Sequence, residues 1–328
     1  MKSGLKLFLK NAEREITLLV VLAALVTTFS LIEPIYLSWP NLRDILDQTS
    51  IVGIIAIGMT FVMIGGGIDL SVGSTVALYG VITASLLVTR GVNPVLMIFI
   101  MIVIGAGVGL VNGLLVTKLR LQPFIATLGT MSLFRGVAFI VTGGLPVTGV
   151  PADFRQLIYG NVIGGIRGSI IIFFGFAIIA HILLKYTAFG SYLYAIGGNV
   201  ESARLSGIKV TKNRNLSYMM TGIATAIAAI IMIARLGAGE STAGQGFELN
   251  AISAAAIGGA SLAGGKGTIA GTVIGAVLLS ALRNGLIVVG LDAFWQFVAT
   301  GVVIIIAAYM EIVQTNMANK SALGKGVK

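Results

Sequence analysis

Apolar runs alternate with short charged, glycine-rich or proline-containing breaks along the whole chain. A run of about 20 apolar residues lets a helix cross the hydrocarbon core of a bilayer. The pattern therefore predicts an all-α, polytopic membrane protein with about ten transmembrane helices, some of them broken or re-entrant. The predicted spans are 16–37, 46–66, 70–89, 94–117, 122–142, 168–185, 216–235, 249–264, 268–289 and 294–312.

The composition supports a membrane protein and leaves little room for any other domain. Of the 328 residues, 56% are hydrophobic and 10% are charged, and the mean hydropathy is +1.00. A soluble domain carries roughly 25% charged residues, so a soluble enzyme and a disordered chain are excluded. We expect an N-terminal segment at 1–15, a membrane domain at 16–312 and a tail at 313–328.

Basic residues divide unevenly between the two sides that these spans define. With the N-terminus inside, fifteen of the 22 Lys and Arg residues fall on inner segments, and three lie within spans or at their edges. The four on outer loops are Arg43, Arg90, Arg155 and Arg167. Cytoplasmic loops carry the excess of positive charge, so both termini are predicted to be cytoplasmic. The net charge of +10 does not indicate a nucleic-acid partner, because no basic stripe is interleaved with aromatic residues.

The sequence offers little that supports catalysis or metal binding. It has no cysteine and one histidine, which excludes disulfides, iron–sulfur clusters and thiolate metal sites and argues against a His-rich metal site. The phosphate-binding pattern G-x-x-x-x-G-K-[ST] does not occur. We therefore expect no enzyme activity, no cofactor and no metal in this chain.

A polar stretch, GGGIDLSVGS at 65–74, separates two apolar runs. Its glycines free the backbone, and Asp69 or Ser71 can cap the helix expected to start near Leu70. One interpretation is a tight inner turn followed by a capped helix. The other is a discontinuous helix whose polar backbone lines a cavity, where lipid tolerates irregular structure. The second makes Asp69 and Ser71 candidate residues of a translocation pathway.

This stretch resembles the signature of permease subunits of bacterial ATP-binding-cassette (ABC) importers for monosaccharides, of the ribose type. Other stretches agree with that family in the same order along the chain. They are QPFIATLGTM at 122–131, RG at 135–136, YAIGGN at 194–199, ARLSGI at 203–208 and GGASLAGG at 258–265. The resemblance implies a multi-pass permease of the bacterial cytoplasmic (inner) membrane that forms the pathway for a monosaccharide such as ribose.

The resemblance also implies partners. A second copy of the chain, or a homologous permease, would complete the pathway within the membrane lipid. A separate ABC ATPase subunit would hydrolyse ATP, and an extracytoplasmic sugar-binding protein would deliver the solute. On the inner loop 186–215, Glu201, Ala203, Arg204 and Gly207 resemble the family's E-A-A-x-x-x-G element, a short helix that docks into the ATPase. Ala203 and Gly207 lie one turn apart on one small-residue face. The alternative is a solvated amphipathic loop.

The segment between 235 and 250 is too polar to lie in lipid, and the charge count places it at the outer end of the seventh and eighth spans. One interpretation is a flexible outer loop. Short spans in transporters often pair with re-entrant segments that line the pathway. We therefore predict an outer gate formed by Thr242, Gln245, Glu248 and Asn250.

Two further patterns concern the interior of the spans. Small residues four apart allow neighbouring helices to approach closely, which assigns a packing role to Gly105, Gly109, Gly113, Gly271 and Gly275. Arg135 and Arg283 lie deep in their spans, where an ionised group faces a cavity or a partner. For Arg135 we expect hydrogen bonds to backbone carbonyls.

Other functions remain open from the sequence. A related permease for branched-chain amino acids, nucleosides or a furanosyl signal molecule is the alternative within the same class. An ion-coupled secondary transporter predicts carboxylates inside the spans, and Asp69 is almost the only candidate. A membrane scaffold leaves the docking element and the glycine-broken helices without a role.

Overall fold

The computed structural model describes residues 13–292, 294–303, 305–306 and 309. The predicted tail at 313–328 and most of the predicted segment 1–15 lie outside these residues, as does part of the tenth span. Within the described residues, eight helices are long and apolar enough to cross a membrane. The chain is an all-α, multi-pass membrane protein, as the sequence predicts.

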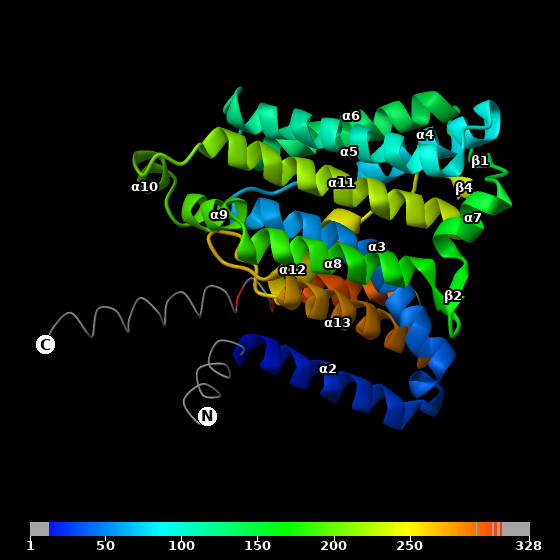
Figure 1. The fold of residues 1–328 in the computed structure, drawn as a ribbon. Helices are drawn as coiled ribbons and strands as arrows, with labels where there is room; N and C mark the ends of the chain where they lie inside the picture. The colour runs from blue at the N-terminus through cyan, green and yellow to red at the C-terminus, as the bar shows by residue number, and fades with distance from the viewer. Residues whose placement is uncertain (1–12, 293, 304, 307–308, 310–328) are drawn as a thin grey trace, which may run out of the picture.

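The spanning helices lie roughly side by side, and the connections gather at two ends (Figure 1). These helices are α2 (Glu13–Ile32), α3 (Trp39–Ile64), α4 (Val72–Arg90), α5 (Pro94–Thr117), α6 (Pro123–Thr142), α8 (Gly168–Tyr186), α11 (Val210–Leu236) and α13 (Ile269–Val288). The short helices α9 (Ala188–Gly198) and α10 (Val200–Leu205) mark one end, which we call the α10 end. The helix α7 (Ala152–Tyr159) marks the other, which we call the α7 end.

Short pieces of regular structure complete the α7 end. A 3₁₀ helix, η1 (Pro34–Leu37), joins α2 to α3. Strand β1 (Val147–Thr148) pairs antiparallel with β4 (Ala238–Gly239), and β2 (Asn161–Ile163) pairs antiparallel with β3 (Ile166–Arg167). The β1–β4 pair joins segments about 90 residues apart in the chain and fixes where the chain leaves α11.

Local sequence sets the limits of several spans. Proline at the first position begins α5 and α6, where its missing N–H has no helical partner to lose. The Asn93 side chain accepts hydrogen bonds from the backbone N–H groups of Val95 (2.9 Å) and Leu96 (3.3 Å), which caps α5. Gly237 ends α11 with a φ of +72°, a conformation that favours glycine.

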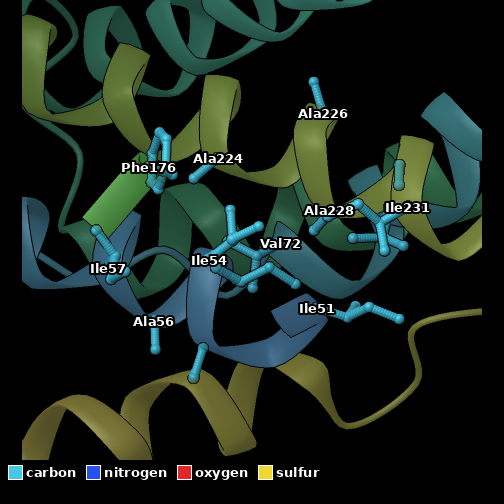
Figure 2. Close-up of a cluster of buried hydrophobic side chains, with 14 of the residues drawn as sticks. Ile51, Ile54, Ala56, Ile57, Val72, Phe176, Ala224, Ala226, Ala228 and Ile231 are labelled. Atoms are coloured by element: carbon cyan, nitrogen blue, oxygen red, sulfur yellow. The ribbon is translucent and has the colours of Figure 1, made fainter. Parts of the chain in front are cut away.

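The core lies where α3, α4 and α11 meet, and α2 lies on the outside of the bundle. Buried side chains make up 83% of the apolar window of α3 and 6% of that of α2. Figure 2 shows Ile54 of α3, Phe176 of α8 and Ala224 of α11 within this core. The small residues of α11 allow α3 and α5 to pack closely on both sides of it.

The glycines with a predicted packing role lie at two helix contacts. A Cβ on Gly105 would lie 2.6 Å from the carbonyl oxygen of Gly222 on α11, and Gly109 and Gly113 face the same helix. Gly271 and Gly275 of α13 face backbone carbonyls at Gly258 and Ala254. Neither contact has room for a larger residue, because the opposing atoms belong to backbone.

The predicted eighth span, 249–264, is not one continuous helix. Its helix is α12 (Phe247–Ile257), 11 residues long, and the chain then turns back through 258–268 to α13. An 11-residue helix reaches about half of the distance across a bilayer. Of the predicted tenth span, residues 295–303 are helical. The other half of the eighth crossing must therefore come from the chain between α11 and α12.

Candidate translocation site

The segment between α11 and α12 enters the bundle instead of remaining at its α7 end. At the β1–β4 pair, Gly239 packs on α4, where a Cβ would lie 2.7 Å from the carbonyl oxygen of Gly80. Seven residues before Gly80 along α4, the backbone of Gly73 touches the backbone of Gly244. The chain thus runs antiparallel to α4 for about half of that helix, and α12 completes the crossing toward the α10 end (Figure 1). We call residues 237–246 the inserted segment.

Arg135 of α6 binds the backbone of the inserted segment. Its guanidinium Nη1 donates hydrogen bonds to the carbonyl oxygens of Ser241 (2.6 Å) and Ala243 (2.7 Å). Residues 241–246 form turns rather than a helix, so their carbonyls lack helical partners, and at membrane depth each unsatisfied group costs several kcal/mol. Arg135 supplies those partners, which accounts for a charged residue deep in an apolar helix.

Arg283 of α13 holds the first turn of α12 in a similar way. Its Nη2 donates a hydrogen bond to the side-chain oxygen of Asn250 and another to the hydroxyl of Thr300 (2.7 Å). Asn250 is buried, and Thr300 lies in the helical residues 295–303. Arg283 therefore connects α12, α13 and the last described helix.

Two hollows adjoin the inserted segment and α12. The first, of about 480 Å³, opens between α6 and the inserted segment, and we call it the α6 groove. Its lining residues are Met131, Ser132, Arg135, Gly136, Phe139, Gln245, Gly246 and Glu248. The second, of about 230 Å³, has Gln48, Arg235, Asn250, Ser280, Arg283 and Gln296 as its polar lining residues. The α6 groove offers hydroxyl, amide, carboxylate and guanidinium groups to a polar solute.

The four residues predicted at an outer gate do not share one site. Gln245 and Glu248 line the α6 groove, and Thr242 is exposed nearby on the inserted segment. Asn250 instead points to Arg283 at the second hollow. Ser132 lines the α6 groove from α6 and was not among the predicted site residues. The sequence feature that could have identified Ser132 is its position one helical turn before Arg135.

Asp69 and Ser71 lie in a buried cluster between α3 and α4, with exposures of 3% and 1%. The Asp69 carboxylate accepts hydrogen bonds from the backbone N–H (2.9 Å) and hydroxyl (2.7 Å) of Ser71 and from the amide of Asn112 on α5 (3.3 Å). Ser71 is the N-cap residue of α4 and makes no side-chain cap. The carboxylate therefore shapes the turn that precedes α4, and neither residue lines the two hollows described above.

The predicted docking element forms α10 and its end. The carboxylate of Glu201 and the guanidinium of Arg204 form an exposed ion pair at 2.8 Å. Gly207 has a φ of +81°, and the backbone N–H groups of Gly207 and Ile208 bond to the carbonyls of Arg204 and Ala203. This is the Schellman pattern that ends a helix at a glycine.

Ala203 and Gly207 do not form the small-residue face that we predicted for docking. Ala203 is buried, with 4% exposure, and Gly207 ends the helix beyond it. Leu205, the last residue of α10, is an apolar side chain with 81% exposure. Leu205 was not among the predicted site residues, because an isolated leucine carries no signal before its exposure is known.

A polar network at the α7 end was also missed. Its centre is Asp47 of α3, which is buried and accepts hydrogen bonds from Tyr159 (2.6 Å), Arg167 (2.9 Å) and Ser169 (2.5 Å). Arg235 of α11 lies 3.8 Å from the same carboxylate. Burial, followed by the bond to Asp47, raises the pKa of Tyr159 to about 12. The network joins the 143–167 connection to α3, α8 and α11.

An inserted polar segment held by arginines within a bundle of apolar helices is typical of membrane transport proteins. The residues that the structure describes include no group of three or more His, Asp or Glu that could hold a metal ion. The fold and the α6 groove thus place the chain in the class of polytopic transport proteins.

Comparison with known proteins assigns the family. A family model described as "Branched-chain amino acid transport system / permease component" matches residues 41–308, so the chain belongs to this family. The ribose import permease protein RbsC of Bacillus subtilis (strain 168) is 43% identical over 289 residues, which cover 88% of this chain and 89% of that protein.

Two other relatives come from Escherichia coli (strain K12). The D-allose transport system permease protein AlsC is 38% identical over 89% of each chain. The galactose/methyl galactoside import permease protein MglC is 34% identical over 94% of this chain and 96% of its own. No solved structure shows a significant match to the chain.

Proposed function

We propose that this chain is the membrane-spanning permease of a bacterial ABC importer for a monosaccharide, and that the α6 groove forms part of the solute pathway. The pathway proposal rests on the inserted segment and the first turn of α12, which bring Gln245 and Glu248 to the groove opposite Ser132 and Arg135. Amide, carboxylate and hydroxyl groups form the hydrogen bonds that a hydroxyl-rich solute needs. The relatives named for ribose, allose and galactose support a sugar as the solute.

ATP hydrolysis belongs to a separate subunit in this proposal. The family name and the import permeases among the relatives support an ATPase at the cytoplasmic face and a binding protein on the opposite face. Positive charge supports the α10 end as the cytoplasmic one, because Lys118, Arg120, Lys209 and Lys212 lie there. The exposed tip of α10 then offers Leu205 to the ATPase. An apolar side chain of this kind is a suitable anchor for a partner's pocket.

A second copy of the chain would complete the pathway. The α6 groove is open on one side, so a single copy does not enclose a solute within it. Exposed apolar residues of α6, including Leu133, Phe139 and Ile140, offer a surface for another membrane helix.

Uptake by vesicles that contain the permease, an ATPase and a sugar-binding protein tests this function. We expect uptake of radiolabelled ribose, galactose or allose that requires ATP on the ATPase side. Uptake of leucine in place of all three sugars would indicate the branched-chain amino acid alternative. Uptake driven by a proton or sodium gradient without ATP would contradict the ABC assignment.

A further inference from the structure

A third hollow, a groove of about 550 Å³, opens at the α10 end between the α5–α6 connection and the start of α11. Three arginines line this basic groove, Arg120, Arg204 and Arg214, and no acidic residue does. Glu201 pairs with Arg204, but in the described part of the chain no carboxylate lies within 4.0 Å of Arg120 or Arg214. The groove therefore carries uncompensated positive charge, which favours an anionic ligand.

Arg120 reaches the groove from an unusual backbone conformation. Its φ is +56°, and no other residue except glycine has a positive φ within the residues that the structure describes. A Cβ disfavours this region, where glycine or asparagine is usual. Strained residues persist where the surrounding structure fixes them, and they cluster at ligand-binding sites. The strained backbone at Arg120 therefore supports a ligand site here independently of the positive charge.

Arg214 is fixed at the wall of the same groove. Its Nε donates a hydrogen bond to the carbonyl of Gly65 (3.2 Å), in the turn after α3. Within the described structure its terminal NH₂ groups have no hydrogen-bond partner, although the guanidinium lines the groove. Two donor groups therefore remain for a ligand.

The position of the basic groove favours a lipid over a soluble anion or a protein. α5 ends at Thr117 and α6 begins at Pro123, and both residues line the groove at the level where these spans leave the hydrocarbon. Beside it, Leu119, Phe124 and Ile125 are 55–65% exposed and offer an apolar surface to acyl chains. A soluble partner would reach the arginines but not the apolar start of a spanning helix.

We propose that the basic groove binds the headgroup of an anionic phospholipid. The phosphate lies among Arg120, Arg204 and Arg214, and the acyl chains follow the exposed residues at the start of α6. Basic pockets at the ends of transmembrane helices bind such headgroups because Arg donates paired hydrogen bonds to phosphate oxygens. Because Arg204 belongs to α10, the bound lipid also contacts the helix that we assign to ATPase docking.

Lipid retention by the purified full-length chain tests the proposal. The chain is mixed with equal amounts of phosphatidylglycerol and phosphatidylcholine in detergent, and bound lipid is counted by native mass spectrometry. We expect phosphatidylglycerol to be retained preferentially, and less so at high salt, because the headgroup is held largely by charge. Removing two arginines with Arg120→Asn and Arg204→Gln should lower this preference about 25-fold, at roughly fivefold for each charge.

A matched control removes two charges from the same end of the molecule. Lys118→Gln with Lys212→Gln leaves the groove lining intact and should keep the preference. Asparagine tolerates the backbone of residue 120, so unfolding should not account for the loss, and an unchanged melting temperature verifies this. Equal retention of the two lipids by the wild type, or displacement of phosphatidylglycerol by millimolar inorganic phosphate, would overturn the proposal. An equal loss in the lysine control would also overturn it.

Discussion

Replacing Arg135 with methionine tests whether this arginine holds the inserted segment in place. The substitution keeps much of the side-chain length and removes the hydrogen bonds to the carbonyls of Ser241 and Ala243. A hydrogen bond from a charged donor contributes roughly 1.5–3 kcal/mol. Because Arg135 is half-buried and lines the open α6 groove, water also reaches its guanidinium, and we expect the lower end for each bond, a loss of about 3 kcal/mol in unfolding free energy.

Thermal unfolding in detergent and thiol labelling measure this effect. With an unfolding entropy of about 2.1 cal/mol/K per residue, a loss of about 3 kcal/mol lowers the melting temperature of this 328-residue chain by roughly 4 °C. Ser241 is buried, so Ser241→Cys, in a chain without other cysteines, should react faster with a thiol reagent once Arg135 is methionine. Ser132→Ala is the control, because its hydroxyl bonds only within α6. An unchanged melting temperature together with unchanged labelling of Ser241→Cys would refute the role of Arg135.

Three further predictions follow from the packing, the buried carboxylate and the exposed tip. Gly109→Leu should destabilise the chain by about 2 kcal/mol or more in thermal unfolding. Gly107→Leu is the control and should not destabilise it, because a Cβ at Gly107 meets no atom within 4 Å. Equal effects of the two substitutions would contradict the contact of α5 with α11. Asp69→Asn should retain transport, because its amide oxygen still accepts the bonds from Ser71, and Asp69→Leu should lose it. A folded but inactive Asn variant would instead indicate a charge-dependent role. Leu205→Asp should reduce co-elution of the ATPase without changing the melting temperature, and normal co-elution would exclude the α10 tip as the docking site.

The spanning helices were predictable from the sequence, because each is a local property of about 20 apolar residues. The packing role of Gly105 and Gly109 could also be predicted from the sequence, because close helix contacts in lipid need small residues at fixed spacing. The eighth span was predicted at 249–264, and some spans were expected to be broken or re-entrant, but hydropathy does not show where the chain turns. The structure ends that helix at Ile257.

The contacts between distant parts of the chain were not predictable from one sequence. The side chains that donate hydrogen bonds to the Asp47 carboxylate belong to Tyr159, Arg167 and Ser169. They lie 112, 120 and 122 residues away along the chain, and no local sequence pattern connects them to Asp47. The carbonyl bonds expected for Arg135 did follow from its depth in a span, but their position on the inserted segment did not. Ala203 and Gly207 were placed on one face by helical spacing alone, and the helix ends between them.

Modification of Gln245→Cys in vesicles that contain the assembled transporter tests most directly whether the α6 groove conducts solute. Gln245 is exposed at the groove, and the chain has no cysteine that competes for the reagent. We predict that a methanethiosulfonate reagent blocks ATP-dependent monosaccharide uptake and that a reducing agent restores it. The same reagent on Phe99→Cys, at a residue of α5 that is 64% exposed, should leave uptake unchanged. Full uptake with Gln245→Cys completely modified would contradict a pathway through the α6 groove.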